Sequence, residues 1–313
     1  MELIRGLHNL RQKHRGCALT IGNFDGLHLG HQALITTVKQ QAKKLNLPSV
    51  VMTFEPLPQE YFKHQPLIRL MGLRDKFRAI QSLGIDRLFC LYFNQTLASF
   101  TAEEFIEKIL IQGLGIRYLV VGDDFRFGRN RTGDYALLKE ASQKYGFELQ
   151  CIPSVVIENK RVSSSWVRES LQQGNLKQAA QLLGRCYSIT GRVIAGDGLG
   201  RTWGIPTANI DIHRQHSPVL GIFAVRVYGL NKRFMNGVAS VGTRPTLGHH
   251  RLLLEVHLFD YDNDIYGHQL RVEFLHKIRD EENFPSIELL KQKIHQDIAE
   301  AKQFFLSLRL KHD

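Results

Sequence analysis

Two histidines three residues apart are the first candidates for chemistry in this sequence. His28 and His31 lie in the stretch TIGNFDGLHLGH, residues 20–31, after an apolar run and just before a predicted helix. Such a pair could hold a zinc ion or donate hydrogen bonds to phosphate oxygens. No further Cys or His stands nearby at the spacing of a metal site. The pair therefore favours phosphate chemistry, and we expect no tightly held metal such as zinc.

The residues around the histidine pair also suit an anion. A strand followed by a helix places the connecting loop at the carboxyl end of a sheet, where α/β proteins bind ligands. Backbone N–H groups at the helix start attract phosphate, and glycines let a ligand approach the backbone closely. The candidate phosphate-binding residues of this loop are Gly22, Asn23, Phe24, Gly26 and Gly30.

A second helix start carries three serines in the stretch VSSSWVR, residues 162–168. A single serine there would be read as a helix N-cap. Three hydroxyl groups, exposed backbone N–H groups and an arginine together favour phosphate binding. The candidates are Ser163, Ser164, Ser165 and Arg168.

The second half of the chain contains the Gly-rich stretch GDGLGRTWGIPTANI, residues 196–210. It matches neither common nucleotide-binding glycine pattern, so the phosphate-loop signal is weak. Thr207 and Asn209 offer oxygen ligands that suit Mg²⁺. Glu255 is a lone carboxylate within an apolar strand, and its side chain could face either side of that strand.

The elements that must position these residues differ between the two halves. Residues 1–185 alternate apolar strands with amphipathic helices, which indicates a doubly wound parallel sheet that ends with a helix over 165–183. Residues 186–313 contain strands separated by turn residues and then one helix over 286–308, which indicates an antiparallel β-barrel with a terminal helix. We therefore predict two domains with a boundary after Arg185.

Composition limits the classes of function. A formal net charge of +11 attracts polyanions, which could be nucleotides or polynucleotides. There is no dense basic run with interleaved aromatic residues, so we expect no nucleic-acid partner. We find neither a signal-peptide pattern nor a membrane-length apolar stretch, and the four cysteines lie far apart. These features predict a cytoplasmic protein with reduced thiols and no membrane partner.

Several stretches in both halves resemble the bacterial bifunctional riboflavin kinase/FAD synthetases. In the first half, GNFDGLHLGHQ resembles that family's HxGH nucleotidyltransferase module, and three more stretches agree with it: TFEPLP, VGDDFRFG and VSSSWVR. In the second half, four stretches resemble the riboflavin kinase pattern: GRTWGIPTANI, GVASVGTRPT, LEVHLFDYDNDIYG and VEFLHKIRDEENF. Three residues depart from the family pattern: Ser165 replaces Thr, Trp166 replaces a frequent Arg, and Ser240 replaces a common Asn.

The resemblance implies a Rossmann-like domain, a kinase barrel and two ATP-dependent reactions. Riboflavin would be phosphorylated to FMN, and FMN would be adenylylated to FAD with release of pyrophosphate. The implied catalytic residues are Glu255 as the base of the kinase, with His28 and His31 in adenylyl transfer. The resemblance further implies nucleotide binding at Gly200, Arg201 and Gly204, binding of Mg²⁺–ATP at Thr207 and Asn209, and flavin contacts at Asp124 and Phe125.

Two other functions compete with this interpretation. The chain could be a nucleotidyltransferase only, acting on another phosphate-bearing substrate, in which case Glu255 would support no phosphorylation. It could instead bind RNA or DNA through its positive charge. Asp124 could also be a plain turn residue. The sequence does not indicate an oligomeric state.

Overall fold

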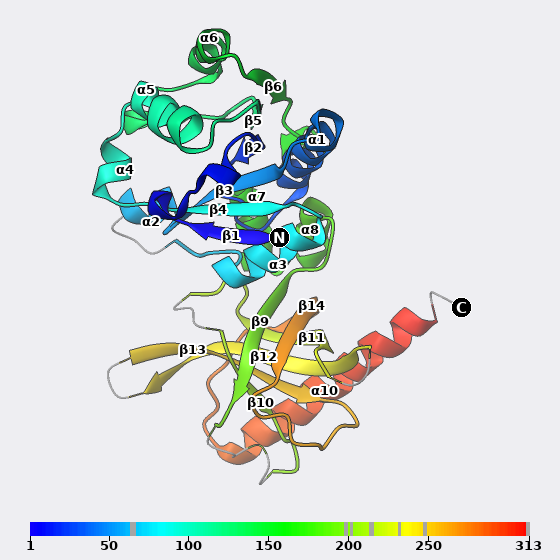
Figure 1. The fold of residues 1–313 in the computed structure, drawn as a ribbon. Helices are drawn as coiled ribbons and strands as arrows, with labels where there is room; N and C mark the ends of the chain where they lie inside the picture. Colours follow the sequence, from blue (N-terminus) through cyan, green and yellow to red (C-terminus); the bar gives the residue numbers. More distant parts are fainter. Residues whose placement is uncertain are drawn as a thin grey trace. The chain divides into compact units, whose positions relative to one another are not determined.

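The computed structural model describes residues 1–62, 67–196, 200, 203–212, 216–230, 233–246 and 249–310. The chain divides into two units, one formed by residues 1–67 and 71–164 and the other by residues 68–70 and 165–313 (Figure 1).

The first unit is built on a six-stranded sheet in which all neighbouring strands run parallel, as predicted. The strands lie in the order β1-β4-β3-β2-β5-β6. Their bounds are Glu2–Arg5 (β1), Ala18–Ile21 (β2), Ser49–Glu55 (β3), Arg87–Tyr92 (β4), Tyr118–Gly122 (β5) and Glu148–Ile152 (β6). The strand β1 at the sheet edge was not predicted.

Helices cover both faces of this sheet. The longer ones are α1 (Leu29–Leu45), α3 (Leu73–Ser82), the π-helix η3 (Phe105–Gly113) and α6 (Tyr135–Tyr145). Shorter elements are α2 (Pro58–Phe62), α4 (Gln95–Ser99), α5 (Ala102–Glu104), η1 (Leu7–Asn9), η2 (Gln12–His14), η4 (Arg129–Arg131) and the hairpin of β7 (Val156–Ile157) with β8 (Lys160–Arg161). Helices α1 and α3 share one buried cluster with the sheet, whereas η3 and α6 share the other.

The strand order creates a switch point beside β2. From β2 the chain continues to β3 on one side, whereas β5 lies on the other side of β2 and leads away to β6. Ligands of doubly wound sheets bind where the connections diverge in this way, beyond the carboxyl ends of the strands. The loops that follow β2 and β5 therefore flank the expected ligand site.

The second unit contains a closed antiparallel barrel in the order β10-β13-β12-β11-β14-β9. Its strands are Ser188–Ile194 (β9), Ala208–Asp211 (β10), Gly221–Tyr228 (β11), Met235–Thr246 (β12), His249–Leu258 (β13) and Gln269–Arg279 (β14). We had not predicted β10, a four-residue strand that follows the Gly-rich stretch and pairs with both β9 and β13.

Helices α7, α8 and α10 follow the first unit along the described part of the chain. The helix predicted over 165–183 is two helices, α7 (Ser164–Gln172) and α8 (Leu176–Leu183), separated by Gly174 with a left-handed φ of 73°. Helix α8 packs against β14, and the division of the chain into two compact units falls after Ser164. The functional boundary after Arg185 stays a prediction.

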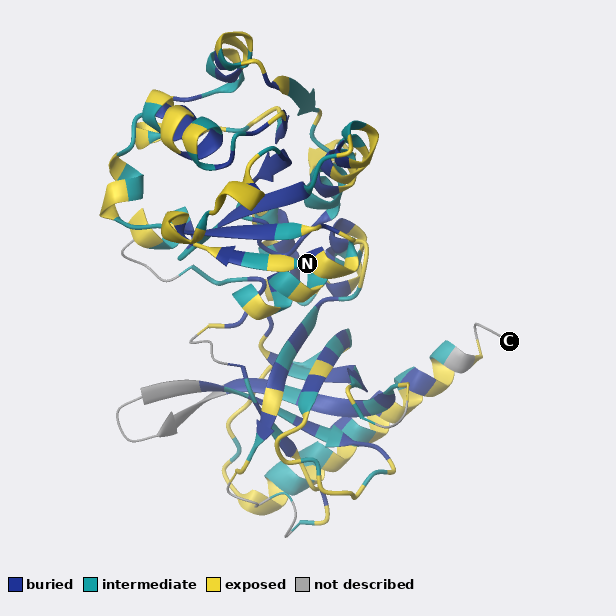
Figure 2. Ribbon diagram, viewed as in Figure 1, coloured by how far each residue is buried: buried dark blue, intermediate teal, exposed yellow. Residues whose placement is uncertain are grey.

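The terminal helix α10 (Ile287–Arg309) packs on the outside of the barrel. Its Ala301 and Phe305 share a buried cluster with Ala224 of β11 and Val238 of β12. Figure 2 shows the strands of both sheets mainly buried, whereas α10 alternates between buried and exposed positions. The barrel therefore has an inner core and, on its outer surface, a second core beneath α10.

A buried ion pair joins the end of β14 to α10. The Nε atom of Arg279 donates to Asp297 Oδ1 at 2.9 Å, and its Nη2 donates to Oδ2 at 2.8 Å. The side chains are only 12% and 5% exposed. The carboxylate of Asp297 raises the pKa of Arg279, so this guanidinium stays charged. The fork-like pair fixes α10 against the strand that ends beside it.

We expect Asp297→Asn to lower the free energy of unfolding of the second unit by about 3 kcal/mol, because the guanidinium loses its buried carboxylate. Both tryptophans of the chain, Trp166 and Trp203, belong to this unit, so tryptophan fluorescence in urea reports its unfolding. Asp280→Asn is the matched control, since Asp280 pairs with Lys277 but is 83% exposed. That control should cost less than about 1 kcal/mol. Equal losses in the two variants would contradict the role of the buried pair.

Candidate active sites

The loop from β2 to α1 has an unusual backbone. Phe24 and Leu27 have left-handed φ angles of 48° and 47°, and Gly26 has a φ of 86°. Left-handed conformations are unfavourable for bulky residues and persist only where the surroundings hold them. Here Phe24 and Leu27 are buried, so the packing of their side chains holds the loop in place.

A buried lysine supports this loop from α3. The Nζ atom of Lys76 donates to the Asn23 carbonyl at 2.6 Å and to Thr53 Oγ1 at 3.2 Å, although only 2% of Lys76 is exposed. On the other side of the loop, Asp25 Oδ1 accepts the backbone N–H of Met71 at 3.1 Å. Sequence reasoning missed Lys76, whose spacing of four residues from the buried Ile80 places it on the inner face of α3.

His28 forms the N-cap of α1. Its Nδ1 accepts the backbone N–H of His31 at 3.4 Å, and the two imidazoles stack with ring centres 3.7 Å apart. Because Nδ1 accepts, the ring proton of neutral His28 lies on Nε2. His28 can therefore donate one hydrogen bond from Nε2 to a ligand at the helix start.

His31 is held in its neutral form. Burial lowers the pKa of its imidazole well below the usual value, and the positive charges of His28, Lys76 and Arg161 lower this pKa further. His31 is therefore uncharged at neutral pH. The pair can offer hydrogen bonds to phosphate, but His31 adds no full positive charge.

The glycine between the two histidines makes room for this stacking. A Cβ at Gly30 would lie 3.2 Å from both Cε1 and Nδ1 of His28, closer than ordinary contact. Gly22 has the same role at the start of the loop, where a Cβ would lie 3.2 Å from the Phe24 ring. The spacing His-Leu-Gly-His therefore places two stacked imidazoles at the N-terminus of α1.

The serine stretch reaches the same loop through Ser164, whose Oγ donates to the Asp25 carbonyl at 2.8 Å. Ser163 precedes α7, and Ser165 and Arg168 lie within it. Arg168 is half-buried and donates from Nε to the Ile68 carbonyl at 2.7 Å. Thus Ser164 lies beside the candidate phosphate loop, while one donor of Arg168 is used to hold the backbone.

The two residues suggested as flavin contacts follow β5 at the switch point. Asp124 pairs with Arg161 of β8 at 2.5 Å, and both side chains are about half exposed at 53% and 48%. Phe125 stacks on Phe127 with ring centres 5.5 Å apart. Arg161, which sequence reasoning missed, brings a half-exposed positive charge to this part of the first unit.

Aromatic side chains gather beyond the carboxyl ends of β3 and β4. Tyr61 and Phe62 of α2 are 41% and 64% exposed, and both rings contact Phe93 with centres 5.4 and 5.7 Å apart. These exposed rings lie at the carboxyl edge of the same sheet, where the ligand site is expected. Sequence reasoning also missed this cluster, because Tyr61 and Phe62 show no distinctive spacing.

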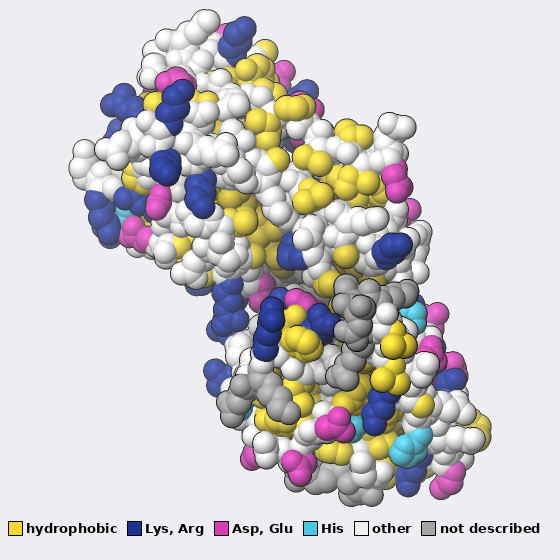
Figure 3. Space-filling view, turned by 90° about the vertical axis from the view of Figure 1, so that its right-hand side faces the viewer, with side chains coloured by type: hydrophobic (Ala, Val, Ile, Leu, Met, Phe, Trp, Pro, Cys, Tyr) yellow, Lys and Arg dark blue, Asp and Glu magenta, His cyan; other side chains and the backbone are white. Residues whose placement is uncertain are grey.

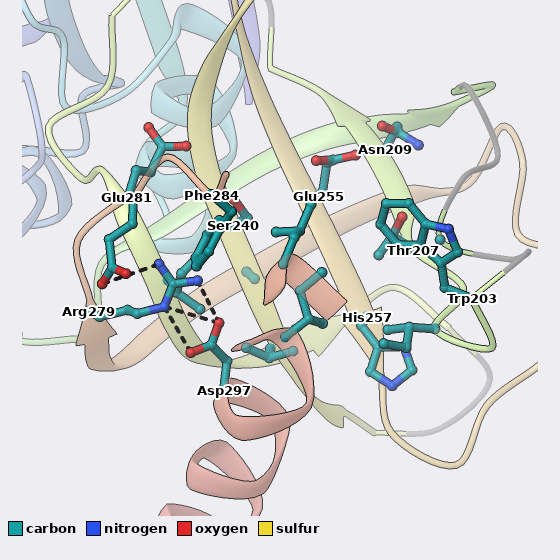
Figure 4. Close-up of a pocket in the computed structure, with 18 residues that line it drawn as sticks. Trp203, Thr207, Asn209, Ser240, Glu255, His257, Arg279, Glu281, Phe284 and Asp297 are labelled. Atoms are coloured by element: carbon teal, nitrogen blue, oxygen red, sulfur yellow. Dashed lines mark hydrogen bonds and ion pairs between the residues drawn. The ribbon is translucent and has the colours of Figure 1, made fainter. Parts of the chain in front are cut away.

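In the barrel, strand pairing places three candidate polar residues in a row. Asn209 of β10 lies opposite Glu255 of β13, which lies opposite Ser240 of β12. Directly opposed residues point to the same face of a sheet. Because Leu254 and Val256 are fully buried inside the barrel, Glu255 points outward (Figure 4). The structure thus resolves which side of the strand the carboxylate faces.

This row lines a cavity of about 350 Å³ on the outer surface of the barrel. Besides Asn209, Glu255 and Ser240, its lining includes Gly200, Trp203, Thr207, His257, Arg279, Glu281, Phe284, Leu290 and Asp297. The last two belong to α10, so the helix closes one side of the cavity. A cavity of this size, lined by apolar side chains and a few polar ones, suits a small-molecule ligand.

Two glycines of the Gly-rich stretch, Gly196 and Gly200, lie directly against Asn209 and Thr207. Any Cβ at Gly196 would collide with the Asn209 amide, and one at Gly200 would lie 3.2 Å from Thr207 Oγ1. Gly204 does not line the cavity but has a left-handed φ of 74° in the neighbouring turn. Arg201 lies outside the described residues. The glycines thus let the chain pass closely over the candidate cation ligands.

Two carboxylates share the cavity. The carboxylate of Glu281 lies against the backbone of Gly242, where a side chain at residue 242 would collide with it. Burial raises the pKa of Glu281, and the neighbouring Glu255 raises it further, whereas Arg279 lowers it. Among the described residues, no three His, Cys, Asp or Glu side chains come together as a metal site.

Comparisons with known proteins agree in both halves. The family model of FAD synthetase matches residues 10–166, and that of riboflavin kinase matches residues 183–305. A bifunctional riboflavin kinase/FMN adenylyltransferase from Haemophilus influenzae is 48% identical over 309 residues, covering 98% of this chain and 100% of the relative. The relative of that name from Escherichia coli K12 is 46% identical over 307 residues, covering 97% and 98%.

This chain belongs to the bifunctional riboflavin kinase/FMN adenylyltransferase family. It is therefore a transferase of flavin-cofactor synthesis with ATP as co-substrate, as predicted. A solved structure from Streptococcus pneumoniae, described as a macrolide-efflux protein, is 30% identical with a TM-score of 0.81 and covers 95% of this chain and 97% of its own. That likeness confirms the predicted fold class. Within the part that the structure describes, every helix is too short or too polar to cross a bilayer.

We expect Gly30→Ala to slow FMN adenylylation about tenfold, because the new methyl group displaces the His28 imidazole by a few tenths of an ångström. Riboflavin phosphorylation by the same chain should not change. Gly72→Ala is the matched control, since Gly72 has an ordinary φ of −78° and open space around its Cβ. Product formation from FMN and from riboflavin measures both rates. A Gly30→Ala chain with full FMN adenylylation would refute the steric argument.

The lowered pKa of His31 predicts a pH-dependent stability. Below its usual pKa of about 6.5, the imidazole takes up a proton in the unfolded chain but stays neutral in the folded one. The native state should therefore lose about 1 kcal/mol between pH 7.5 and pH 5.5 through this group. His31→Gln, which cannot titrate, should lose less over the same range. Urea unfolding of both chains at both pH values measures this difference, and parallel losses would show that His31 titrates normally.

Proposed function

We propose that adenylyl transfer takes place around His28 and His31, at the carboxyl edge of the parallel sheet. An oxygen of the FMN phosphate attacks the α-phosphorus of ATP, and the bond to the leaving pyrophosphate breaks as the new P–O bond forms. The FMN phosphate is already ionised, so the site needs alignment and hydrogen-bond donors rather than a base. The stacked imidazoles of His28 and His31 and the N-terminus of α1 support this role.

The remaining groups of the first site have supporting roles in this proposal. Ser163, Ser164 and Ser165 would meet phosphate oxygens with hydroxyl or backbone donors, and Arg168 would add positive charge. Lys76 keeps the loop in position through its bonds to Asn23 and Thr53. The exposed aromatic cluster around Phe62 would stack on the flavin ring, with Asp124 and Phe125 at its other side.

We propose that riboflavin is phosphorylated in the barrel cavity, with Glu255 as the base. The observation that carries this proposal is the row of Asn209, Glu255 and Ser240 facing one cavity. The primary hydroxyl of riboflavin gives its proton to Glu255 as its oxygen attacks the γ-phosphorus of ATP and ADP leaves. Gly200, Arg201 and Gly204 would lie along the phosphates. The functional domains in this proposal are residues 1–185 and 186–313.

Thr207 and Asn209 fit a Mg²⁺ ion that is shared with ATP. Their hydroxyl and amide oxygens are hard donors, and Mg²⁺ usually takes few protein ligands because water and phosphates complete its shell. When bound, the ion would neutralise charge on the transferring phosphoryl group. Gly196 and Gly200 approach these side chains so closely that a residue with a Cβ at either position would crowd them.

The partners in this proposal are riboflavin, FMN, FAD and ATP, without nucleic acid or membrane. Lys and Arg side chains are dispersed among other groups on the face in Figure 3, rather than gathered in a continuous stripe that would follow a polynucleotide. A supply of ATP and the four free thiols suit the cytoplasm.

Glu255→Gln tests the second site. Loss of the base should slow riboflavin phosphorylation by about 10²–10⁴-fold, while the conversion of added FMN to FAD continues. Flavin products separated by chromatography measure both reactions in the same chain. Wild-type phosphorylation by this variant would remove Glu255 from the mechanism and favour an adenylyltransferase alone.

The double substitution His28→Ala with His31→Ala tests the first site. Removal of both donors should slow FMN adenylylation by about 10²-fold or more. Riboflavin should then be converted to FMN, and FMN should accumulate. Unchanged urea unfolding of the second unit serves as the folding control for the kinase. If this folded variant lost both activities, the assignment of one reaction to each site would be wrong.

A further inference from the structure

His257 lies in the kinase cavity but has no part in the reaction described above. It stands two residues after Glu255 on β13, and it points to the same outer face of the strand (Figure 4). Its Nδ1 lies 2.9 Å from the carbonyl oxygen of Pro206. A carbonyl only accepts hydrogen bonds, so Nδ1 carries a proton and donates it.

The acceptor belongs to the segment that leads into β10. Pairing between β10 and β13 begins with Ala208 opposite Val256, so Pro206 and Thr207 lie just before the paired region. The bond from His257 therefore continues the attachment of this segment to β13 by means of a side chain. One residue earlier in the chain, the N–H of Ile205 donates to the Gly200 carbonyl at 2.8 Å.

The held segment carries both candidate cation ligands. Thr207 directly follows the acceptor residue, and Asn209 comes two residues later, opposite Glu255. Thr207 lines the cavity, so a shift of the backbone at Pro206 would also move the Thr207 hydroxyl within it. Asn209 and Glu255 would stay in place, because strand pairing holds them.

We propose that His257 is a positioning residue of the kinase site, which directs the Thr207 hydroxyl toward Mg²⁺–ATP through its Nδ1–H bond to Pro206. This inference rests on the proposed role of Thr207. It does not place His257 in contact with either substrate. It predicts that loss of the bond weakens the use of ATP and Mg²⁺ but leaves the use of riboflavin unchanged.

A pair of amide substitutions tests this geometry. In His257→Asn the amide nitrogen takes the place of Nδ1, so the donor to Pro206 is kept. In His257→Gln the amide nitrogen lies one bond further out, closer to the place of Nε2, and the donor is lost. We expect His257→Gln to raise KM for ATP and the half-saturating Mg²⁺ concentration about tenfold, as the loss of one hydrogen bond would. His257→Asn should stay close to the wild type, and KM for riboflavin should not change in either variant.

The adenylylation reaction and a third variant, Thr207→Ala, show which part of the proposal is wrong if the expected result is not found. FMN adenylylation by each chain shows that the first site is intact, and tryptophan fluorescence in urea shows that the barrel is folded. Thr207→Ala should raise the same two constants if the proposed role of Thr207 holds. An effect of Thr207→Ala with wild-type behaviour of His257→Gln would overturn the role of His257 alone. No effect of Thr207→Ala would overturn the proposed cation site, and equal damage by the two His257 variants would show that ring packing, not the hydrogen bond, is what matters.

Discussion

The pairing of β13 with β10 and β12 sets Asn209, Glu255 and Ser240 in one row. Strand register likewise positions the candidate site in the other half of the chain. Strand register leaves side chains little freedom in direction, because neighbours on one face are fixed by the backbone. In the first unit, parallel register brings the loops after β2 and β5 to one edge. Both candidate sites are therefore consequences of strand pairing, to which the helices add charge, capping and closure.

The polar groups at the two sites differ in how they carry charge. At the first site, burial keeps His31 neutral, and the buried Lys76 is bound to loop oxygens. At the second, Glu255 and Glu281 share one cavity with Arg279 close by. This difference matches the chemistry assigned to each site. An attacking phosphate needs donors and no base, whereas an attacking hydroxyl needs a carboxylate to accept its proton.

Long periodic elements were predictable, whereas short elements and tertiary supports were not. The strand before His28 and the terminal helix follow from hydrophobic period, and glycine spacing marked both loops. Strand β10 was missed because its four residues follow a Gly- and Pro-rich stretch that reads as a turn. Lys76 was missed because a lone lysine on an amphipathic helix normally faces solvent, and only the fold shows that it is buried. The side of β13 that Glu255 faces could be assigned only from the strand register of the closed barrel.

The most direct test of the two-site account is the balance of products when the full chain receives riboflavin, ATP and Mg²⁺. Phosphoryl transfer releases ADP and adenylyl transfer releases pyrophosphate, so the two reactions leave different by-products. If each site carries one reaction, FMN appears before FAD, with one ADP and one pyrophosphate released for each FAD formed. A reaction started from FMN should release pyrophosphate without ADP. Persistence of riboflavin while FMN is converted to FAD would contradict the kinase site in the barrel.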